Sequence, residues 1–416
     1  MEFIVYQLII TITLLLSPII ILLRIIKNKE DKKRFLEKFC FFSKTRKNGK
    51  LIWFHGSSVG EIMSIIPIIK YYENKSVVDQ ILITSSTMSS ANILNKYKFK
   101  KTIHQFFPID FYFMTRKFLN YWKPTIAIFL ESEIWPSMFN GLRRKKIPLV
   151  LLNARITNKS FNKWYLIKRF AQNIFNNINY SYPQNFETSR YLKKLNVKNV
   201  KLIGNLKFIE NPYDKVNFFN KNLIKKFSHY KVWVAASTHK DEEIICAIAH
   251  KILKKKIKNL ITIIIPRHIN RVESIISKIK NLGLNIILHS KKEKLNNSDI
   301  YLVDTYGESR SFYKIAKTVF LGGSIIKHGG QNPLEAARYG AKILHGKNIK
   351  NFRDIYKYLK KLNFSKSVSN SKQIAQSINF GSLNKNNYEV REKGKEILKK
   401  TTEELNILIK HAIQKA

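Results

Sequence analysis

Short runs of hydrophobic residues alternate with stretches of helical period along most of the chain. From about residue 50 onward, apolar runs of four to six residues are each followed by a segment whose apolar positions recur every three or four residues. This alternation predicts βαβ units, and therefore an α/β fold with parallel sheets. The predicted strands are 51–54, 80–84, 125–130, 148–152 and 200–203 in the first half, and 232–236, 260–265, 285–288, 300–303, 318–321 and 342–344 in the second.

The two halves of the chain begin with the same local pattern. Trp53 and Trp233, 180 residues apart, each lie in a predicted strand that leads through a turn of small residues to a glutamate and a predicted helix. This repeat predicts two Rossmann-like domains with a cleft between them. We place these domains at residues 27–210 and 211–416, after an N-terminal segment of residues 1–26.

The N-terminal segment is hydrophobic enough to enter a membrane. The 21 residues from Phe3 to Leu23 carry no charge and would span about 32 Å as a helix. A cleaved signal peptide is the alternative, but it needs a basic start and a small-residue cleavage site, whereas this segment begins with Glu2 and runs into Arg24. We therefore predict an uncleaved anchor. Residues 24–50 contain 11 Lys or Arg against three acidic residues, and the positive-inside bias places the bulk of the chain in the cytoplasm.

The chain as a whole is strongly basic. The 416 residues carry a net charge of +47, with 60 Lys but only 15 Arg, and Asn and Ile are also abundant, as in AT-rich genomes. Codon drift explains much of this charge, and an acidic partner such as anionic lipid or a phosphorylated substrate accounts for the rest. Nucleic-acid binding predicts Arg-rich or aromatic-interleaved patches, and the even spread of Lys argues against it. The two cysteines are far apart, which argues against a zinc site.

Polar residues follow the predicted strands at their carboxyl ends, where open α/β sheets bind ligands. Glu61 lies about one turn into a predicted helix, where it is either a carboxylate stabilised by the helix dipole or a general base. Glu131 and Glu133 follow a strand at positions i and i+2, so an extended chain would point both to one face; the alternative is a strand-end cap. Arg267 follows an apolar strand, and its guanidinium needs either a phosphate or an internal salt bridge.

A glycine-rich segment in the second half is the most specific motif. Gly329 and Gly330 would let the backbone approach a ligand, and Asn332-Pro333 would start a helix whose free N–H groups attract phosphate. Glu335 would then meet ribose hydroxyls. The chain has no GxGxxG or Walker A motif, which disfavours NAD and ATP, and no HExxH, GxSxG or DxD motif.

Taken together, these motifs resemble the 3-deoxy-D-manno-octulosonic acid (Kdo) transferases of lipopolysaccharide synthesis. The resemblance covers nearly all of residues 30–355 in order, although Gln331 stands where the family usually has histidine. The matching segments are WFHGSSVGE from Trp53, PID from Pro108, ESEIWP from Glu131, NARIT from Asn153, GNLK from Gly204, STHKDEE from Ser237, PRH from Pro266, DTYGE from Asp304 and GGSIIKHGGQNPLEAA from Gly322.

The resemblance implies a two-domain GT-B glycosyltransferase that inverts the anomeric centre. CMP-Kdo would be the donor, and the acceptor would be the 6′-hydroxyl of the tetraacyl disaccharide bisphosphate precursor of lipid A. It implies Glu61 as general base, with Glu131 and Lys207 as transition-state residues. It implies no metal and no cofactor, and an enzyme on the cytoplasmic side of the bacterial inner membrane. The implied CMP contacts are Pro266, Arg267, Tyr306, Gly307, Glu308, Asn332, Pro333, Leu334 and Glu335.

Another GT-B glycosyltransferase acting on a membrane acceptor is the nearest alternative. It would share the fold and the glycine-rich donor loop, but not the segments SVGE and ESEIWP.

Overall fold

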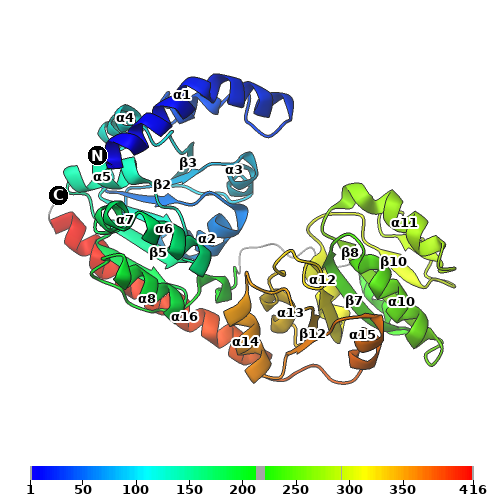
Figure 1. The fold of residues 1–416 in the computed structure, drawn as a ribbon. Helices are drawn as coiled ribbons and strands as arrows, with labels where there is room; N and C mark the ends of the chain where they lie inside the picture. The colour runs from blue at the N-terminus through cyan, green and yellow to red at the C-terminus, as the bar shows by residue number, and fades with distance from the viewer. Residues whose placement is uncertain (1, 212–220, 292, 415–416) are drawn as a thin grey trace. The chain divides into compact units, whose positions relative to one another are not determined.

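The computed structural model describes residues 2–211, 221–291 and 293–414. Its contacts divide the chain into two units, each built on one parallel sheet (Figure 1). Unit 1 comprises Met1–Tyr213 and Gly394–Ala416, and unit 2 comprises Asp214–Lys393.

The sheet of unit 1 has six parallel strands in the order β3-β2-β1-β4-β5-β6, which is the Rossmann order. Every residue of its four inner strands β1, β2, β4 and β5 is buried, so these strands are covered on both faces, which explains their nearly continuous apolar sequence. The strands are β1 Leu51–His55, β2 Gln80–Ser85, β3 Thr102–Phe106, β4 Ile126–Leu130, β5 Leu149–Ala154 and β6 Tyr180–Pro183.

Helices connect these strands. Helix α2 starts after Ser58, whose side chain accepts a hydrogen bond from the backbone of Glu61, and α5 begins with a proline, as first-turn positions favour. The helices are α1 Glu2–Ile26, η1 Phe35–Phe39, α2 Val59–Glu73, α3 Met88–Leu94, α4 Tyr112–Trp122, α5 Pro136–Arg144, α6 Asn158–Leu166, α7 Lys168–Phe175, α8 Phe186–Lys194 and η2 Leu206–Phe208.

Unit 2 repeats the parallel plan with seven strands in the order β13-β12-β11-β7-β8-β10-β9. Its strands are β7 Lys231–Thr238, β8 Leu260–Pro266, β9 Ile286–Leu288, β10 Ile300–Leu302, β11 Thr318–Leu321, β12 Lys342–His345 and β13 Ser365–Ser367. Its helices are α9 Lys221–Ser228, α10 Glu242–Lys254, η3 Ile269–Arg271, α11 Val272–Lys280, α12 Ser309–Ile315, α13 Leu334–Arg338, α14 Arg353–Lys361 and α15 Ser371–Ser377.

The last helix, α16 (Asn387–Gln414), returns to unit 1. Tyr182 donates a hydrogen bond to Glu404 at 3.1 Å, and Tyr72 donates one to Asn406 at 3.0 Å. Gly204 has φ +130°, and a Cβ there would come within 2.9 Å of Ile397 on α16. The GNLK segment therefore needs its glycine for packing as well as for its backbone conformation.

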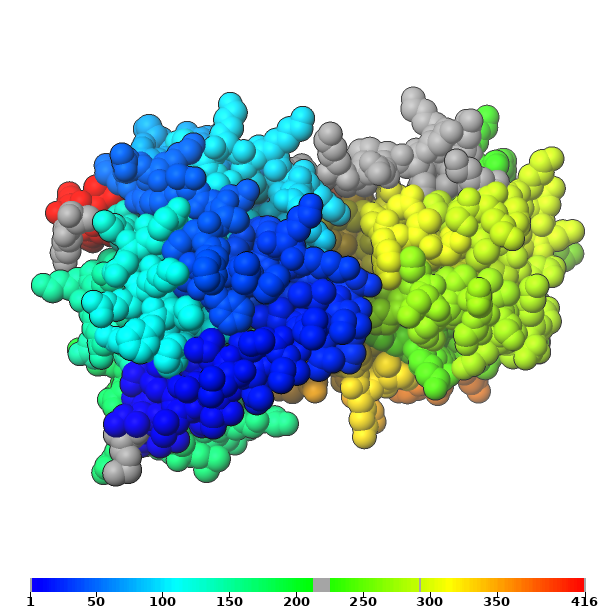
Figure 2. Space-filling model, turned by 90° about the horizontal axis from the view of Figure 1, so that it is seen from above, coloured from blue at the N-terminus to red at the C-terminus, as the bar shows by residue number. Residues whose placement is uncertain are grey.

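Helix α1 is the N-terminal segment that the sequence predicts as an anchor. Among the described residues it is the one helix long and apolar enough to cross a membrane, judged by length and composition. Figure 2 shows its dark blue residues lying against the blue and cyan surface of unit 1.

The sequence prediction was wrong about one strand and missed three. Residues 200–203 form no strand, and Val200 makes only an isolated bridge to Ser181. Strands β3, β6 and β13 were not predicted, and all three lie at sheet edges.

Candidate functional site

In unit 1 three glutamates gather at the carboxyl ends of β1 and β4, where the strand order reverses. Such a switch point is the usual ligand site of an open α/β sheet. Glu61 comes from the first turn of α2, whereas Glu131 and Glu133 come from the loop after β4.

Glu61 closes the capping box of α2. Its Oε2 atom accepts hydrogen bonds from the backbone N–H groups of Ser57 at 2.7 Å and Ser58 at 3.3 Å. The Glu61 N–H in turn donates to Ser58 Oγ at 3.3 Å. Among the described residues no hydrogen bond reaches Glu61 Oε1. One carboxylate oxygen therefore supports the helix, and the other is open to a substrate.

The surroundings of Glu61 favour its protonated form. Burial and then the negative charges of Glu133 and Glu131 raise the pKa of Glu61 to about 7, against the opposing hydrogen bonds from Ser58. A carboxyl group with this pKa is both a competent base and a competent acid near neutral pH.

Glu133 is held by donors that sequence analysis did not identify. His55 Nε2, Ser57 Oγ and Trp135 Nε1 lie 3.1, 2.6 and 2.9 Å from Glu133 Oε2. Burial raises the pKa of Glu133, but hydrogen bonds from His55, Ser57 and Trp135 outweigh burial and lower the pKa below its ordinary value. Glu133 thus stays ionised beside Glu61. Its position, a polar residue just beyond an apolar strand, was the available sequence signal.

His55 has a defined tautomer in this network. It is fully buried, and burial lowers its pKa, so it is neutral near pH 7. Because Nε2 faces the Glu133 carboxylate, Nε2 carries the proton, and Nδ1 accepts from Thr84 Oγ1 at 2.9 Å. The indole of Trp53 donates to the same hydroxyl oxygen at 2.9 Å. A buried chain of hydrogen bonds therefore fixes the Glu133 carboxylate.

Glu131 pairs with the third predicted catalytic residue. Lys207 Nζ lies 2.8 Å from Glu131 Oε1, and their side chains are 17% and 8% exposed. Asn153 Nδ2 donates to Glu131 Oε1 at 3.3 Å, and Asn153 Oδ1 accepts from the backbone of Leu206 at 3.0 Å. Asn153 therefore ties the GNLK segment, which carries Lys207, to the loop after β4.

Glu131 and Glu133 do not lie on an extended chain, contrary to the prediction that such a chain would point both to one face. Glu131 has φ +47° and lies beyond the last residue of β4. Both carboxylates nevertheless raise the pKa of Glu61, so both lie near it.

Asp110 of the PID segment holds the start of α5, the helix that follows the loop carrying Glu131 and Glu133. Asp110 is buried and accepts hydrogen bonds from the backbone N–H groups of Ser137 at 2.9 Å and Met138 at 2.8 Å, at the start of α5. Burial raises the pKa of Asp110 to about 6, against these hydrogen bonds. Asp110 thereby fixes the helix that follows the ESEIW loop.

In unit 2 a buried glutamate, Glu242, organises the loops after β7 and β11. Its Oε2 atom accepts from the backbone of His239 at 3.0 Å and Gly323 at 2.6 Å, and Oε1 accepts from Ser324 at 3.1 Å and Ile325 at 3.0 Å. Sequence analysis missed this role, although Glu242 lies in the STHKDEE segment. The glycine-rich loop is thus built around a carboxylate of the protein itself.

Cationic and imidazole groups surround this loop. His239 packs against His328 with ring centroids 4.1 Å apart, and Gln331 Nε2 lies 3.3 Å from His239 Nε2. Burial lowers the pKa of His239 to about 4, helped by His328, His268, Arg267 and Arg271.

Arg267 lies immediately after the last residue of β8. The residue is exposed and forms no ion pair with any residue that the structure describes, so the internal salt bridge is not present there. By contrast, Arg271 is bound by both oxygens of Glu243, at 3.0 and 3.1 Å. Arg267 is therefore available to an anionic ligand.

The remaining predicted donor residues lie in two loops. Tyr306 is 66% exposed, Gly307 has φ +90°, and Glu308 Oε2 lies 3.1 Å from His289 Nε2. Glu335 pairs with Arg310 at 3.0 Å rather than standing alone. The other members are Pro266 at the end of β8, Asn332, which accepts from the backbone of Leu334, Pro333, and the buried Leu334.

The glycine-rich loop differs from the prediction in the length of the helix that follows it. The helix after Pro333 is only five residues long, so it offers little of the N-terminal field that was expected. Gly329 and Gly330 do have positive φ, +109° and +79°, but an added Cβ would meet Asn351 and Ile349. These glycines are needed for packing against residues 348–351.

A family model and a sequence relative both match this chain to the same family of known proteins. A family model described as 3-Deoxy-D-manno-octulosonic-acid transferase (kdotransferase) matches residues 33–210. The 3-deoxy-D-manno-octulosonic acid transferase of Rickettsia bellii (strain RML369-C) is 37% identical over 354 residues, 83% of each chain.

Solved structures confirm the predicted fold class. UDP-GlcNAc 2-epimerase from Neisseria meningitidis matches with a TM-score of 0.57 and 12% identity, covering 88% of this chain and 100% of that one. A glycosyltransferase from Rickettsia africae ESF-5 matches with a TM-score of 0.55 and 12% identity, covering 89% and 100%. The two parallel sheets are those of the GT-B fold.

Proposed function

The chain belongs to the Kdo transferase family, and on this premise we propose that it transfers Kdo from CMP-Kdo to the 6′-hydroxyl of the tetraacyl disaccharide bisphosphate precursor of lipid A. Family membership carries the coarser statement, a glycosyltransferase that moves Kdo in lipopolysaccharide synthesis. The acceptor and the position of attachment are our proposal. The observation that supports the chemistry best is the open Oε1 of Glu61 in a group whose pKa is about 7.

The proposed reaction is one direct displacement. Glu61 Oε1 takes the proton of the acceptor hydroxyl as that oxygen bonds to the anomeric carbon of Kdo. The bond from this carbon to the CMP phosphate oxygen breaks at the same time, so the centre is inverted and CMP leaves. Glu133, held by His55, keeps a negative charge near Glu61 and so keeps Glu61 a strong base for a carboxylate.

Lys207 supplies positive charge on the acceptor side. Kdo carries a carboxylate next to its anomeric carbon, and a cation beside it lowers the repulsion of an incoming nucleophile. Lys207 is oriented by Glu131 at 2.8 Å, which positions the ammonium without neutralising the whole site.

Unit 2 would hold the nucleotide. The exposed Arg267 is the proposed phosphate ligand, with His239, His268 and His328 gathered beside it. Tyr306, Gly307, Glu308 and residues 332–335 would hold the rest of CMP, and Glu335 would accept from the ribose. These fixed positive groups can stabilise the departing phosphate, so the proposal uses no metal and no cofactor.

We propose that the protein acts at the cytoplasmic side of the bacterial inner membrane and that α1 attaches it to this membrane. The acceptor carries two phosphates and lies in an anionic leaflet, which suits a chain of net charge +47. Nucleic acid is not a proposed partner.

A direct assay tests the proposal. Purified protein is incubated with CMP-Kdo and the tetraacyl precursor, and the lipid product is weighed by mass spectrometry. We expect a mass increase of one or more Kdo residues. An unchanged acceptor, together with thermal stabilisation by a uridine nucleotide but not by CMP, would favour a different GT-B glycosyltransferase.

Replacing Arg267 by alanine should weaken CMP binding. Loss of one charge-assisted hydrogen bond costs about 1.5–3 kcal/mol, or roughly 10- to 150-fold in affinity. Calorimetry with CMP measures this. Lys258→Ala is the matched control, because Lys258 is an exposed cation just before the opposite end of the same strand. Equal CMP affinity in the wild type and the Arg267 variant would remove Arg267 from the donor site.

The pH dependence of turnover should report Glu61. As the base must be deprotonated, kcat/KM should rise with pH through about 7, the pKa of Glu61. Glu133→Gln removes a charge that raises this pKa, so the rise should move to lower pH. An unmoved profile in this variant would contradict the assignment of Glu61 as the titrating base.

A further inference from the structure

We propose that α1 lies in the plane of the membrane surface, pressed against unit 1, with its outward face among the acyl chains of one leaflet, rather than crossing the bilayer. The proposal rests on the proposed function only for the presence of a membrane. It concerns how the chain is attached, and it assigns the lipid leaflet as the partner of one helix face.

Both ends of α1 are bonded to the same unit. Near its start, Tyr6 donates to Asp110 at 2.6 Å and Gln7 donates to Ser137 at 2.7 Å. Just beyond its end, Glu30 is bound by Arg24 at 3.0 Å and Lys38 at 2.6 Å. A helix of 25 residues is about 37 Å long, so a bilayer crossing would put these two ends on opposite sides. Unit 1 cannot be on both.

One stripe of α1 is buried or half-buried along the length of the helix. Its less exposed positions recur every three or four residues, which places them on one side of the helix. Ser17 and Ile21, in the middle and the last third of the helix, are only 5% and 7% exposed. The stripe includes polar side chains, which would face hydrocarbon if the helix crossed the bilayer alone. Its members are Phe3, Tyr6, Gln7, Ile10, Thr11, Leu14, Ser17, Ile21, Arg24 and Ile25.

The opposite face of α1 is apolar and exposed. Twelve large apolar residues on this helix are open to solvent, far more than a water-soluble surface usually gathers in one place. An in-plane helix buries such a face in the boundary between headgroups and acyl chains. These residues are Ile4, Val5, Leu8, Ile9, Ile12, Leu15, Leu16, Ile19, Ile20, Leu22, Leu23 and Ile26.

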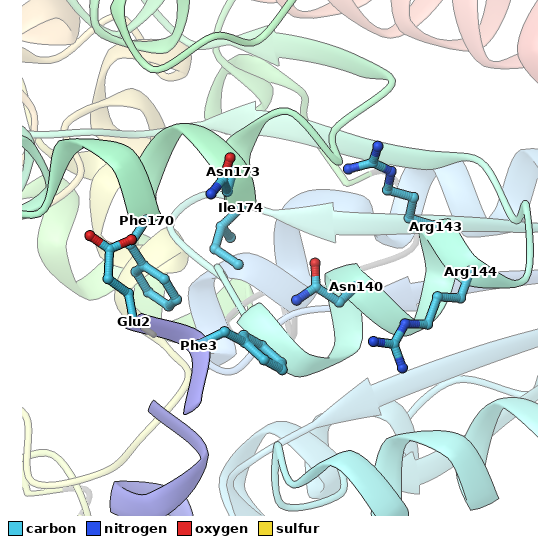
Figure 3. Close-up of a pocket in the computed structure, with 8 residues that line it drawn as sticks. All are labelled: Glu2, Phe3, Asn140, Arg143, Arg144, Phe170, Asn173 and Ile174. Carbon is cyan, nitrogen blue, oxygen red and sulfur yellow. The ribbon is translucent and has the colours of Figure 1, made fainter. Parts of the chain in front are cut away.

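Positive charge lies beside both ends of this face. At the start, a hollow of about 600 Å³ is lined by Arg143 and Arg144 of α5, residues of α7, and Glu2 and Phe3 of α1 (Figure 3). At the other end, exposed Lys27, Lys29, Lys32 and Lys33 follow the helix. In an in-plane orientation, these lysine and arginine side chains would lie at the depth of the lipid phosphates. We therefore infer that the partner of the exposed face is an anionic leaflet and not an apolar protein surface.

Thiol labelling in sealed membrane vesicles tests the topology of the full-length chain. Glu2→Cys and, as the matched control, Lys32→Cys place an exposed cysteine before and after the apolar run. The wild type is the blank, because Cys40 and Cys246 are buried. We expect a membrane-impermeant maleimide to label both variants from the same side. Labelling of Glu2→Cys from the opposite side only would overturn the proposal.

A depth measurement gives a second test that does not depend on vesicle sidedness. Bimane is attached to a cysteine at Ile4, Ile12 or Leu23, all on the exposed face, and quenched by lipids spin-labelled at known depths. An in-plane helix gives similar depths at the three sites. A much deeper position for Ile12 than for the other two would indicate a crossing helix and overturn the proposal.

The basic residues can be tested with vesicles of defined composition. Arg143→Gln with Arg144→Gln should reduce flotation with vesicles that contain phosphatidylglycerol, but not with pure phosphatidylcholine vesicles. Lys193→Gln with Lys194→Gln is the control, because this exposed basic pair lies on α8, away from α1 (Figure 1). Equal losses in the two double variants would overturn the charge assignment. Kdo transfer measured on the same samples reports the proposed function separately from the topology.

Discussion

Replacing Glu61 by glutamine is expected to lower turnover by about 100- to 10,000-fold, the usual contribution of general-base catalysis. Glutamine keeps the length of the side chain and an oxygen that can accept from Ser57 and Ser58 in the capping box. It removes the basicity of the open Oε1 atom. CMP affinity and melting temperature should stay close to those of the wild type.

A matched control separates the two roles of Glu61. Ser58→Ala removes the other half of the capping box, which should cost about 0.5–2 kcal/mol of stability and leave the base in place. The two variants should therefore show opposite patterns, lost turnover in one and lost stability in the other. Near-normal turnover of Glu61→Gln would show that Glu61 only caps α2.

The inner strands of both sheets could be predicted from sequence because burial on both faces makes them continuous apolar runs. The strands that were not predicted lie at sheet edges and do not form continuous apolar runs. Strand β13 has the sequence SKS, and only its first residue is partly buried. Like β3 and β6, it has one strand neighbour and needs few apolar residues. Residues 200–203 were wrongly predicted as a strand because they form a short apolar run. An apolar run becomes a strand only if it pairs with a neighbour, and here only Val200 does so, through one isolated bridge.

The position of each candidate residue could be predicted, but not its partners. A polar residue after an apolar strand marks the carboxyl end of that strand, which is why sequence alone placed Glu61, Glu131 and Arg267 beyond β1, β4 and β8. Sequence could not show that His55 holds Glu133, because these residues are 78 positions apart and meet only when β1 and β4 pair. It could not show the left-handed backbone of Glu131 either, since glutamate rarely adopts it.

For the N-terminal helix α1, the sequence could predict a membrane segment but not its orientation. Its length and lack of charge indicated a membrane segment, but apolar residues occur on all its sides, so the sequence alone did not distinguish the side that packs on protein. The polar residues Tyr6, Gln7 and Ser17 carry that information only once their partners or their burial are known.

Replacing Lys207 by methionine is expected to lower kcat/KM by about 100- to 1,000-fold, comparable to removing one preorganised group that stabilises transition-state charge. Methionine keeps a long unbranched side chain but leaves Glu131 without the ammonium at 2.8 Å. The single variant should therefore also lose stability, because a mostly buried carboxylate loses its partner. Lys201→Met is the control, since Lys201 forms an exposed ion pair with Glu404 in the same unit.

The double variant Lys207→Met, Glu131→Gln distinguishes catalysis from packing. Glutamine removes the unpaired charge and can still accept from Asn153, so the melting temperature should recover toward the wild-type value. Turnover should not recover, because the cation that would meet the Kdo carboxylate is still missing. The measurement is kcat/KM and melting temperature of the wild type, both single variants and the double variant on one set of preparations. Recovery of turnover together with stability would mean that Lys207 serves only to neutralise Glu131, and that positive charge for the donor sugar comes from elsewhere.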